Sequence, residues 1–321
     1  MNDNAEIQIG VLIVNYRTPQ LTIDCLRSLA PEVATVAPTV VVVVDNGSGD
    51  GSAELIRSEI ESQNWHWARL VDAARNLGFA GGNNLAWQHV TRCRYVLLLN
   101  SDTVVNPGCL RHCHMAMEAD ATIGAMSCLV LNADGTVQNV TRRFPTPLNQ
   151  LACRLGLPWR WPRLFGGADT EDPTWDRRTV KRDVGWIGGA FMFLRGDMVR
   201  RIGLLDESFF FYGEDIEFCH RIWRSGYRVH FDPASSIVHY GGASSDPTRL
   251  ASETQNAHRR EARYLVQRKC HGRTAAWLMR ASDLGVCTLR LLARSCSGRS
   301  VTPERREIRQ LLSVPRRRAV R

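Results

Sequence analysis

The sequence predicts an α/β fold with a doubly wound, parallel sheet, because apolar runs alternate four times with segments of helical character. The runs cover residues 7–14, 40–44, 68–71 and 95–99. The uninterrupted runs 40–44 and 95–99 are typical of strands buried on both faces, 7–14 is an apolar strand, and 68–71 is a short one. Polar residues follow each run. Because ligands bind beyond the carboxyl ends of the strands in such sheets, the sequence places a site there.

The segments between the runs carry helix signals. Thr18 followed by Pro19 is typical of an N-cap and a first-turn proline, with an apolar stripe after them. A second helix is expected over about 53–63, and another after the glycine-rich segment 75–84. No internal repeat is visible, and no G-x-G-x-x-G follows the first strand, which weakens a dehydrogenase interpretation.

Composition indicates an ordinary globular protein of 321 residues, with 44% hydrophobic and 23% charged residues. The polar start lacks the features of a signal peptide, and no run is long and apolar enough to span a membrane. Ten cysteines then suggest reduced core thiols and a cytoplasmic location. Cys109 and Cys113 stand at i, i+4 without a second ligand pair, which favours core packing over a metal site.

The net charge of +9 is unevenly distributed. Residues 247–321 contain 18 Lys and Arg against 5 Asp and Glu, whereas residues 1–246 contain 23 against 27. We therefore expect a body over 1–246 and a basic helical tail over 247–321, with helices near 253–269 and 274–294 and a disordered end. The second helix suits an anionic membrane surface, and the alternative is a helix packed on the body. Nucleic acid is disfavoured because no binding motif is present.

Asp102 is the most informative candidate for chemistry. It follows the apolar run 95–99, and its carboxylate suits a hard divalent cation. The alternative is that Asp102 caps a helix in which Pro107 is the first-turn proline. Asp45, after five valines, is placed to accept hydrogen bonds from a base or a ribose, or else is a turn residue of Asp-Asn-Gly. Arg75 and Asn76 precede glycines that let a backbone approach a ligand closely.

The second half adds a carboxylate pair and a histidine. Glu214 and Asp215 begin a predicted helix, as a cap or as a reactive pair, and the preceding aromatic residues suggest a partly dry pocket. His239 ends a short apolar run before two glycines, as a structural residue or a metal ligand. The segment of about 144–182 mixes aromatic and basic residues around Trp159 and Trp161; it suits an acceptor or membrane contact, and we favour a surface loop.

Seven motifs in order make the chain resemble the inverting glycosyltransferases of family 2, in the bacterial rhamnosyltransferase-like group. The resemblance spans residues 7–245 and rests on the segments 14–16, 44–48, 76–84, 99–103, 189–191, 209–215 and 238–242. It implies the GT-A fold, a nucleotide-diphosphate sugar donor (UDP- or dTDP-linked, with dTDP-L-rhamnose as the best single choice), and a glycan or polyprenyl-diphosphate-linked acceptor in cell-surface polysaccharide synthesis. It also implies work at the cytoplasmic face of the inner membrane.

The resemblance also implies residue roles. Asp102 and His239 would bind Mg²⁺ or Mn²⁺, Asp215 would be the general base, and Glu214 is the first carboxylate of its motif. Asn100 replaces the first Asp of a strict D-x-D motif, so the metal affinity is expected to be modest. The implied donor-binding residues are Asn15, Asp45, Arg75, Asn76, Gly78, Asn100, Ser101 and Asp102. The implied acceptor-side residues are Trp186, Gly188, Gly189 and Ala190.

Two alternatives stay open. A sugar nucleotidyltransferase would need a glycine- and lysine-rich phosphate loop after the first strand, and residues 15–17 do not provide one. A non-catalytic module that kept the fold would bind a nucleotide sugar without turnover.

Overall fold

The structure is a computed structural model that describes residues 7–168, 171–172, 174–241, 249–297 and 300–313. The chain divides into two compact units. The first comprises residues 1–142 and 174–251, and the second comprises residues 143–173 and 252–321. We call them the catalytic unit and the helical unit and describe each by itself. The predicted disordered end at 315–318 lies outside the described residues.

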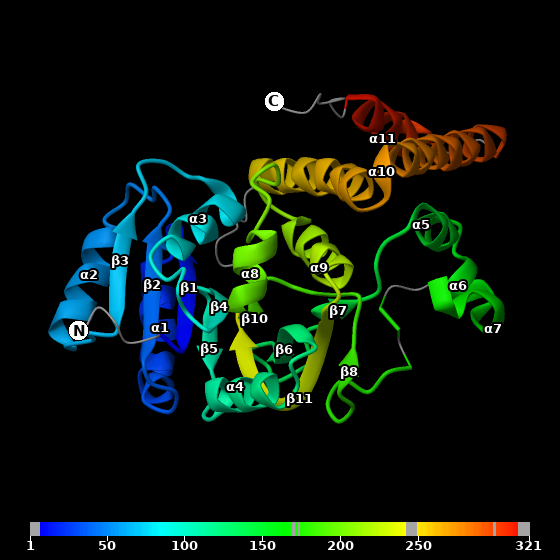
Figure 1. Ribbon diagram of the computed structural model, residues 1–321. Helices are drawn as coiled ribbons and strands as arrows, with labels where there is room; N and C mark the ends of the chain where they lie inside the picture. The colour runs from blue at the N-terminus through cyan, green and yellow to red at the C-terminus, as the bar shows by residue number, and fades with distance from the viewer. Residues whose placement is uncertain (1–6, 169–170, 173, 242–248, 298–299, 314–321) are drawn as a thin grey trace. The chain divides into compact units, whose positions relative to one another are not determined.

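One half of the main sheet of the catalytic unit is parallel, as the apolar runs predict (Figure 1). Its strands are β3 (Ala68–Asp72), β2 (Thr39–Asp45), β1 (Ile9–Asn15) and β4 (Tyr95–Asn100), in that spatial order. All three neighbouring pairs are parallel, and Asn15 of β1 is in register with Asp45 of β2. This register brings the polar residues at the carboxyl ends of the strands to one edge.

The other half of the sheet is mixed. After β4 come β10 (Phe191–Arg195), β6 (Ile123–Leu131), β11 (Arg228–His239) and β5 (Thr103–Val105), while β8 (Arg182–Asp183) pairs with β11. Among the described strands of this half, β6 and β11 form the one parallel pair. Strand β10 is antiparallel to β4 and β6, and β5 is antiparallel to β11. The structure therefore confirms a mixed, Rossmann-like α/β fold.

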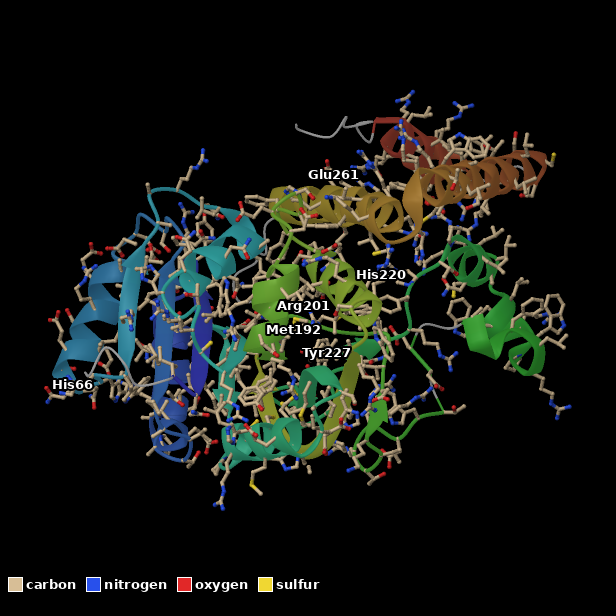
Figure 2. All side chains as sticks on the ribbon, viewed as in Figure 1. His66, Met192, Arg201, His220, Tyr227 and Glu261 are labelled. Carbon is tan, nitrogen blue, oxygen red and sulfur yellow. The ribbon has the colours of Figure 1, made fainter. Side chains whose placement is uncertain are left out.

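Helices α1 (Pro19–Val33), α2 (Ser52–Ser62), α3 (Gly78–Trp87), α4 (Cys109–Ala119), α8 (Gly196–Ile202) and α9 (Glu214–Arg224) complete the catalytic unit. Buried side chains such as Met192 of β10 fill its core (Figure 2). The guanidinium of Arg201 lies 5.2 Å from the ring centre of Tyr227. Cys109 and Cys113 are fully buried in this core, which confirms the packing interpretation.

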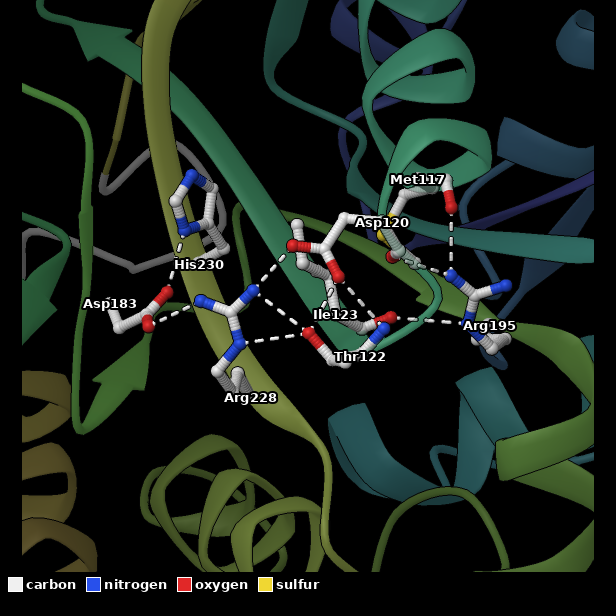
Figure 3. Close-up of polar contacts among 8 residues, drawn as sticks. All are labelled: Met117, Asp120, Thr122, Ile123, Asp183, Arg195, Arg228 and His230. Carbon is white, nitrogen blue, oxygen red and sulfur yellow. Dashed lines mark hydrogen bonds and ion pairs between the residues drawn. The ribbon is translucent and has the colours of Figure 1, made fainter.

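Two arginines tie the end of α4 to the neighbouring strands (Figure 3). Arg228 of β11 binds the carboxylates of Asp120, just after α4, and of Asp183 in β8, the latter at 2.6 Å. Arg195 of β10 donates to the carbonyl oxygens of Met117 (2.8 Å) and Asp120 (3.1 Å). The bonds from Arg195 satisfy the carbonyl group of Met117 in the last turn of α4, where carbonyls lack a partner within the helix, and that of Asp120 just after it.

The helical unit contains α5 (Pro147–Arg154), α6 (Leu157–Arg160), α7 (Pro162–Phe165), the 3₁₀ turn η1 (Gly166–Ala168), most of α10 (Arg249–Cys296), and α11 (Thr302–Ser313). The favoured surface-loop interpretation of 144–182 is thus wrong for its first part. A reciprocal capping box between Thr146 and Asn149, with Pro147 in the first turn, starts a helix there. The backbone of Gly272 breaks α10, which matches the two helices predicted for the tail.

Asp283 is the polar centre of the helical unit. Its side chain is 1% exposed and accepts a 2.6 Å hydrogen bond from the hydroxyl of Tyr264. Arg154 of α5 and Arg263 of α10 reach the same carboxylate at 3.4 and 3.3 Å. Arg154 also binds Glu307 of α11 at 2.7 Å, so one network holds α5, α10 and α11 together. No helix among the described residues is long and apolar enough to cross a membrane.

Candidate active site

The ends of β1 and β2 are joined by their polar residues. Asn15 is fully buried and donates its amide N–H to Asp45 at 2.7 Å. Asp45 also accepts from the backbone N–H (3.1 Å) and the hydroxyl (2.6 Å) of Ser48. Asp45 is therefore a rigid carboxylate at the sheet edge, and the same contacts form the turn that the alternative interpretation predicted.

A pair of asparagines, Asn46 and Asn76, fixes the loop before α3. Asn46 donates to Asn76 at 3.2 Å and to the Gly78 carbonyl at 3.1 Å, and it accepts from the Leu77 N–H at 3.0 Å. Arg75 is exposed beside this loop. Gly78 has φ +74°, and a Cβ there would lie 2.4 Å from the Phe210 carbonyl oxygen.

The expectation that the glycines of this segment approach a ligand is wrong for Gly81 and Gly82. Both lie inside α3, where added Cβ atoms would come within 2.8 Å of Leu77 and 2.9 Å of Val14. Gly82 allows α3 to pack closely on β1, and Gly81 leaves room for the Leu77 side chain at the start of α3.

Asp102 lies in the turn between β4 and β5, with no helix nearby to cap. The next helix, α4, starts at Cys109 after Gly108 at the N-cap position, so the capping interpretation is wrong. The Asp102 carboxylate is 5% exposed and its Oδ1 lies 3.1 Å from Nε2 of His239. Asn100 points its amide nitrogen at the same Nε2, also at 3.1 Å. Ser101 is buried beside them, 3.5 Å from the hydroxyl of Thr18.

Gln138 is a residue of this site that the sequence analysis missed. Its Oε1 lies 2.6 Å from Nδ1 of His239, and its Nε2 donates to Asn132 at 3.0 Å. The bond to Asn132 fixes the amide so that its oxygen faces the imidazole. Nδ1 therefore carries a proton, and Nε2 is the ring nitrogen that faces Asp102. Gln138 stands outside every strand and every motif, so sequence spacing gave no signal for it.

The donor set around Asp102 and His239 fits a divalent cation. A carboxylate oxygen and an imidazole nitrogen face each other at 3.1 Å, and both are atom types that bind divalent cations. Among the described residues, no group of three or more His, Cys, Asp and Glu is gathered for a metal ion. A cation held there would take two ligands from these side chains, and its remaining positions would be open to phosphate oxygens and water.

Glu214 and Asp215 start α9, as predicted, and their environments differ. Glu214 is 7% exposed, and its Oε2 has no hydrogen-bond partner among the residues that the structure describes. Burial, together with the neighbouring Asp215 charge, raises the pKa of Glu214 to about 8. Burial also raises the pKa of Asp215, to about 6, but backbone N–H groups, including that of Gly189, and the Arg142 charge favour its ionised form. Burial and the neighbouring charge thus disfavour two negative charges in the pair, and the backbone donors favour a charge on Asp215.

The segment 186–190 connects this pair to the Asp102 turn. The Ala190 carbonyl accepts from the Asn100 N–H at 3.1 Å, and Gly189 lies against both Asp215 and the Phe79 ring. Gly188 donates to the Val140 carbonyl at 2.7 Å. The Trp186 ring centre lies 5.9 Å from the Arg142 guanidinium. The predicted metal, acceptor and base residues thus meet in one continuous region.

The aromatic residues before α9 only partly match the expected dry pocket. Phe209 is buried, whereas Phe210 and Phe211 are 49% and 39% exposed. The carbonyl of Phe210 accepts from the Phe79 N–H at 3.1 Å, so the main chain of this loop, rather than a wall of rings, joins it to the start of α3.

Comparison with family models decides the class of this protein. The model described as Glycosyl transferase family 2 matches residues 10–171, and that of Glycosyl transferase family group 2 matches residues 174–294. The chain belongs to glycosyl transferase family 2. Membership confirms the glycosyltransferase prediction and favours it over the nucleotidyltransferase and non-catalytic alternatives.

Relatives of this family 2 protein include hexosyl- and rhamnosyltransferases. The low-salt glycan biosynthesis hexosyltransferase Agl10 of Haloferax volcanii is 28% identical over 250 residues, covering 77% of this chain and 71% of that protein. The N-acetylglucosaminyl-diphospho-decaprenol L-rhamnosyltransferase of Mycobacterium tuberculosis is 25% identical over 267 residues, covering 78% and 82%. Rhamnosyltransferase WbbL of Escherichia coli is 26% identical over 202 residues, covering 60% and 71%.

Solved structures show the same fold at low sequence identity. The mannosyltransferase PcManGT of Pyrobaculum calidifontis, in complex with GDP-Man and Mn²⁺, has a TM-score of 0.53 at 16% identity, over 96% of this chain and 85% of that chain. GalNAc-T7, with UDP, GalNAc and Mn²⁺, has a TM-score of 0.53 at 16% identity, over 74% and 44%. These neighbours confirm the predicted GT-A fold.

Proposed function

We propose that this protein is a divalent-cation-dependent, inverting glycosyltransferase that moves L-rhamnose from a dTDP- or UDP-linked donor to a lipid-linked glycan acceptor. The observation that carries the proposal is the meeting of Asp102 and His239 at 3.1 Å, at the sheet edge where Asn15 and Asp45 also end. The rhamnosyltransferase relatives, of which one acts on a diphospho-decaprenol lipid, support the sugar and the acceptor class.

The donor side is assigned to the edge formed by β1, β2 and β4. Asp45, with Asn15, is proposed to hold the ribose or base, and the loop of Arg75, Asn76 and Gly78 is proposed to close over the nucleotide. Asp102 and His239 would hold Mg²⁺ or Mn²⁺, flanked by Asn100 and Ser101. When bound, the cation supplies positive charge that stabilises the departing nucleoside diphosphate.

The acceptor side is assigned to the segment 186–190 and to the start of α9. Trp186, Gly188, Gly189 and Ala190 would shape the path of the acceptor hydroxyl. Ionised Asp215 takes the proton of that hydroxyl. The oxygen of the acceptor hydroxyl bonds to the anomeric carbon as the bond from that carbon to the diphosphate breaks. One displacement inverts the anomeric centre. Protonated Glu214 limits the pair to one negative charge.

We further propose that the protein acts at the cytoplasmic face of the inner membrane, because the acceptor of the mycobacterial relative carries a decaprenol chain. The basic helical unit is consistent with such a location.

Calorimetric titration tests the donor site. UDP, dTDP, GDP and CMP are titrated with and without Mn²⁺ into wild-type protein and into Asp102→Ala. We expect binding of UDP or dTDP that depends on Mn²⁺ and is lost in Asp102→Ala. The matched control is Glu61→Ala, which removes an exposed carboxylate on α2, outside the site. Absence of nucleotide binding by the folded wild type would refute the donor site, and equal binding by Asp102→Ala would refute its metal role.

A further inference from the structure

The second half of α10 has an exposed face without charge, which we call the α10 stripe. It consists of Trp277, Leu278, Ala281, Gly285, Thr288, Leu289 and Leu292. Their spacing of three and four residues places them on one side of the helix over about four turns. Trp277 and Leu289 are 68% and 64% exposed, and a Cβ added at Gly285 would meet open space.

The opposite side of the same helix is buried by its own unit. Met279, Asp283 and Cys287 are at most 1% exposed. Asp283 binds Arg154, and Arg290 donates to the Arg154 carbonyl of α5 at 2.7 Å. The rotation of α10 about its axis is therefore fixed, and the α10 stripe is the face turned away from these contacts.

Charge identifies the partner that this face fits. The helical unit contains 21 Lys and Arg against 8 Asp and Glu, whereas the catalytic unit contains 20 against 24. Several of those carboxylates are already paired within the unit: Asp283 and Glu307 with Arg154, and Glu304 with Arg294 at 2.9 Å. An apolar face on a unit of net positive charge is the pattern of a helix lying in an anionic lipid interface.

A second exposed set in the same unit has the same chemistry. Trp159, Trp161 and Leu164 are 67%, 52% and 79% exposed on α6 and α7 and in the turn between them. Arginines interleave with them, and no Asp or Glu occurs from Gly135 to Ala168. Indole rings beside arginine side chains are favoured at the headgroup level of a bilayer.

We propose that the helical unit docks on an anionic membrane surface, with the α10 stripe as the face that enters the headgroup region. The proposal deepens the proposed function, because it assigns to a named face the contact that would bring the catalytic unit to a lipid-linked acceptor. The partner is the anionic bilayer itself, without a specific headgroup.

Vesicle flotation of the full chain tests the proposal without donor or acceptor. Vesicles of phosphatidylglycerol and phosphatidylcholine are compared with vesicles of phosphatidylcholine alone, each at low salt and at about 0.5 M salt. The higher salt screens exposed charges more strongly than a physiological concentration of about 0.15 M. We expect binding to the anionic vesicles that weakens with salt. The variant Trp277→Glu/Leu289→Glu/Leu292→Glu should lose binding about tenfold or more, because three apolar side chains leave the interface.

Two controls make the result decisive. Leu55→Glu changes an exposed leucine on α2 of the catalytic unit and should bind vesicles as the wild type does. Light scattering and calorimetry with Mn²⁺ and UDP are run on every variant. Wild-type vesicle binding by the triple variant would overturn the proposal. A wild type that is a dimer in solution, together with a triple variant that is a monomer, would also overturn it, because the α10 stripe would then bind a second copy. Absence of nucleotide binding by the wild type would instead count against the proposed function, since vesicle flotation does not require nucleotide binding.

Discussion

Gln138 orients His239 through a 2.6 Å hydrogen bond between its Oε1 and the imidazole Nδ1. The bond leaves Nε2 of His239 facing Asp102 at 3.1 Å. Gln138 touches neither the carboxylate nor the reacting groups, so it is a positioning residue. Partners of this kind set the tautomer and the ring orientation of a metal-binding histidine.

Replacing Gln138 should weaken metal binding more than nucleotide binding. For Gln138→Ala we expect the apparent Mn²⁺ affinity, measured by calorimetry in the presence of UDP or dTDP, to fall about 10- to 100-fold. Nucleotide binding without metal should not change. Gln88→Ala, at an exposed glutamine, is the matched control. An unchanged Mn²⁺ affinity in Gln138→Ala would show that the hydrogen bond does not orient the ligand.

The acidic limb of the pH profile should report Asp215. Because burial raises the pKa of Asp215 to about 6, the fraction of ionised base falls as the pH drops through 6, and kcat/KM should fall with it. Asp215→Asn should lose activity by about 10²- to 10⁴-fold and should lose this limb. Asp206→Asn, in the preceding turn, serves as the control. A profile flat from pH 5 to 8 would argue against Asp215 as the base.

Gly78 should be irreplaceable because of what faces it. Gly78→Ala would put a Cβ 2.4 Å from the Phe210 carbonyl oxygen at φ +74°, so we expect a loss of about 1–3 kcal/mol in the free energy of unfolding. Gly49→Ala has a similar φ of +64° but meets nothing within 4 Å, and it should cost less. Urea denaturation measures both. Equal losses would mean that backbone strain, rather than the close approach to Phe210, dominates.

Removing the buried carboxylate of the helical unit should destabilise that unit. Asp283→Ala leaves the guanidinium of Arg154 without one of its partners and the Tyr264 hydroxyl without its acceptor, at a cost of about 3–5 kcal/mol. Far-UV circular dichroism during thermal unfolding measures the loss, with Asp134→Ala of the catalytic unit as the control. A stability change equal to that of the control would show that the network is not needed for packing α5 and α11 on α10.

Much of the fold could be predicted from local patterns. The four predicted strands became β1, β2, β3 and β4. The apolar segments of β1, β2 and β4 are buried on both faces, as an uninterrupted apolar segment of strand length requires, whereas β3 is only partly buried. Thr18 and Pro19 marked the start of α1, although the Thr18 hydroxyl binds Asn15 rather than capping the helix. The segment 144–168 was harder, because short helices such as α6 and α7 have too few residues for a periodic signal.

The sequence by itself determined the family, the alternation of strands and helices, and the residues that line the sheet edge, because motifs and apolar periods are local properties of the chain. Only the tertiary structure decided which of these residues meet. It brought His239 to Asp102 and placed Gln138 behind it, through the pairing of β11 with β5 and β6. It also separated the protonation states of Glu214 and Asp215, since burial and neighbouring charge are set by residues distant in the chain.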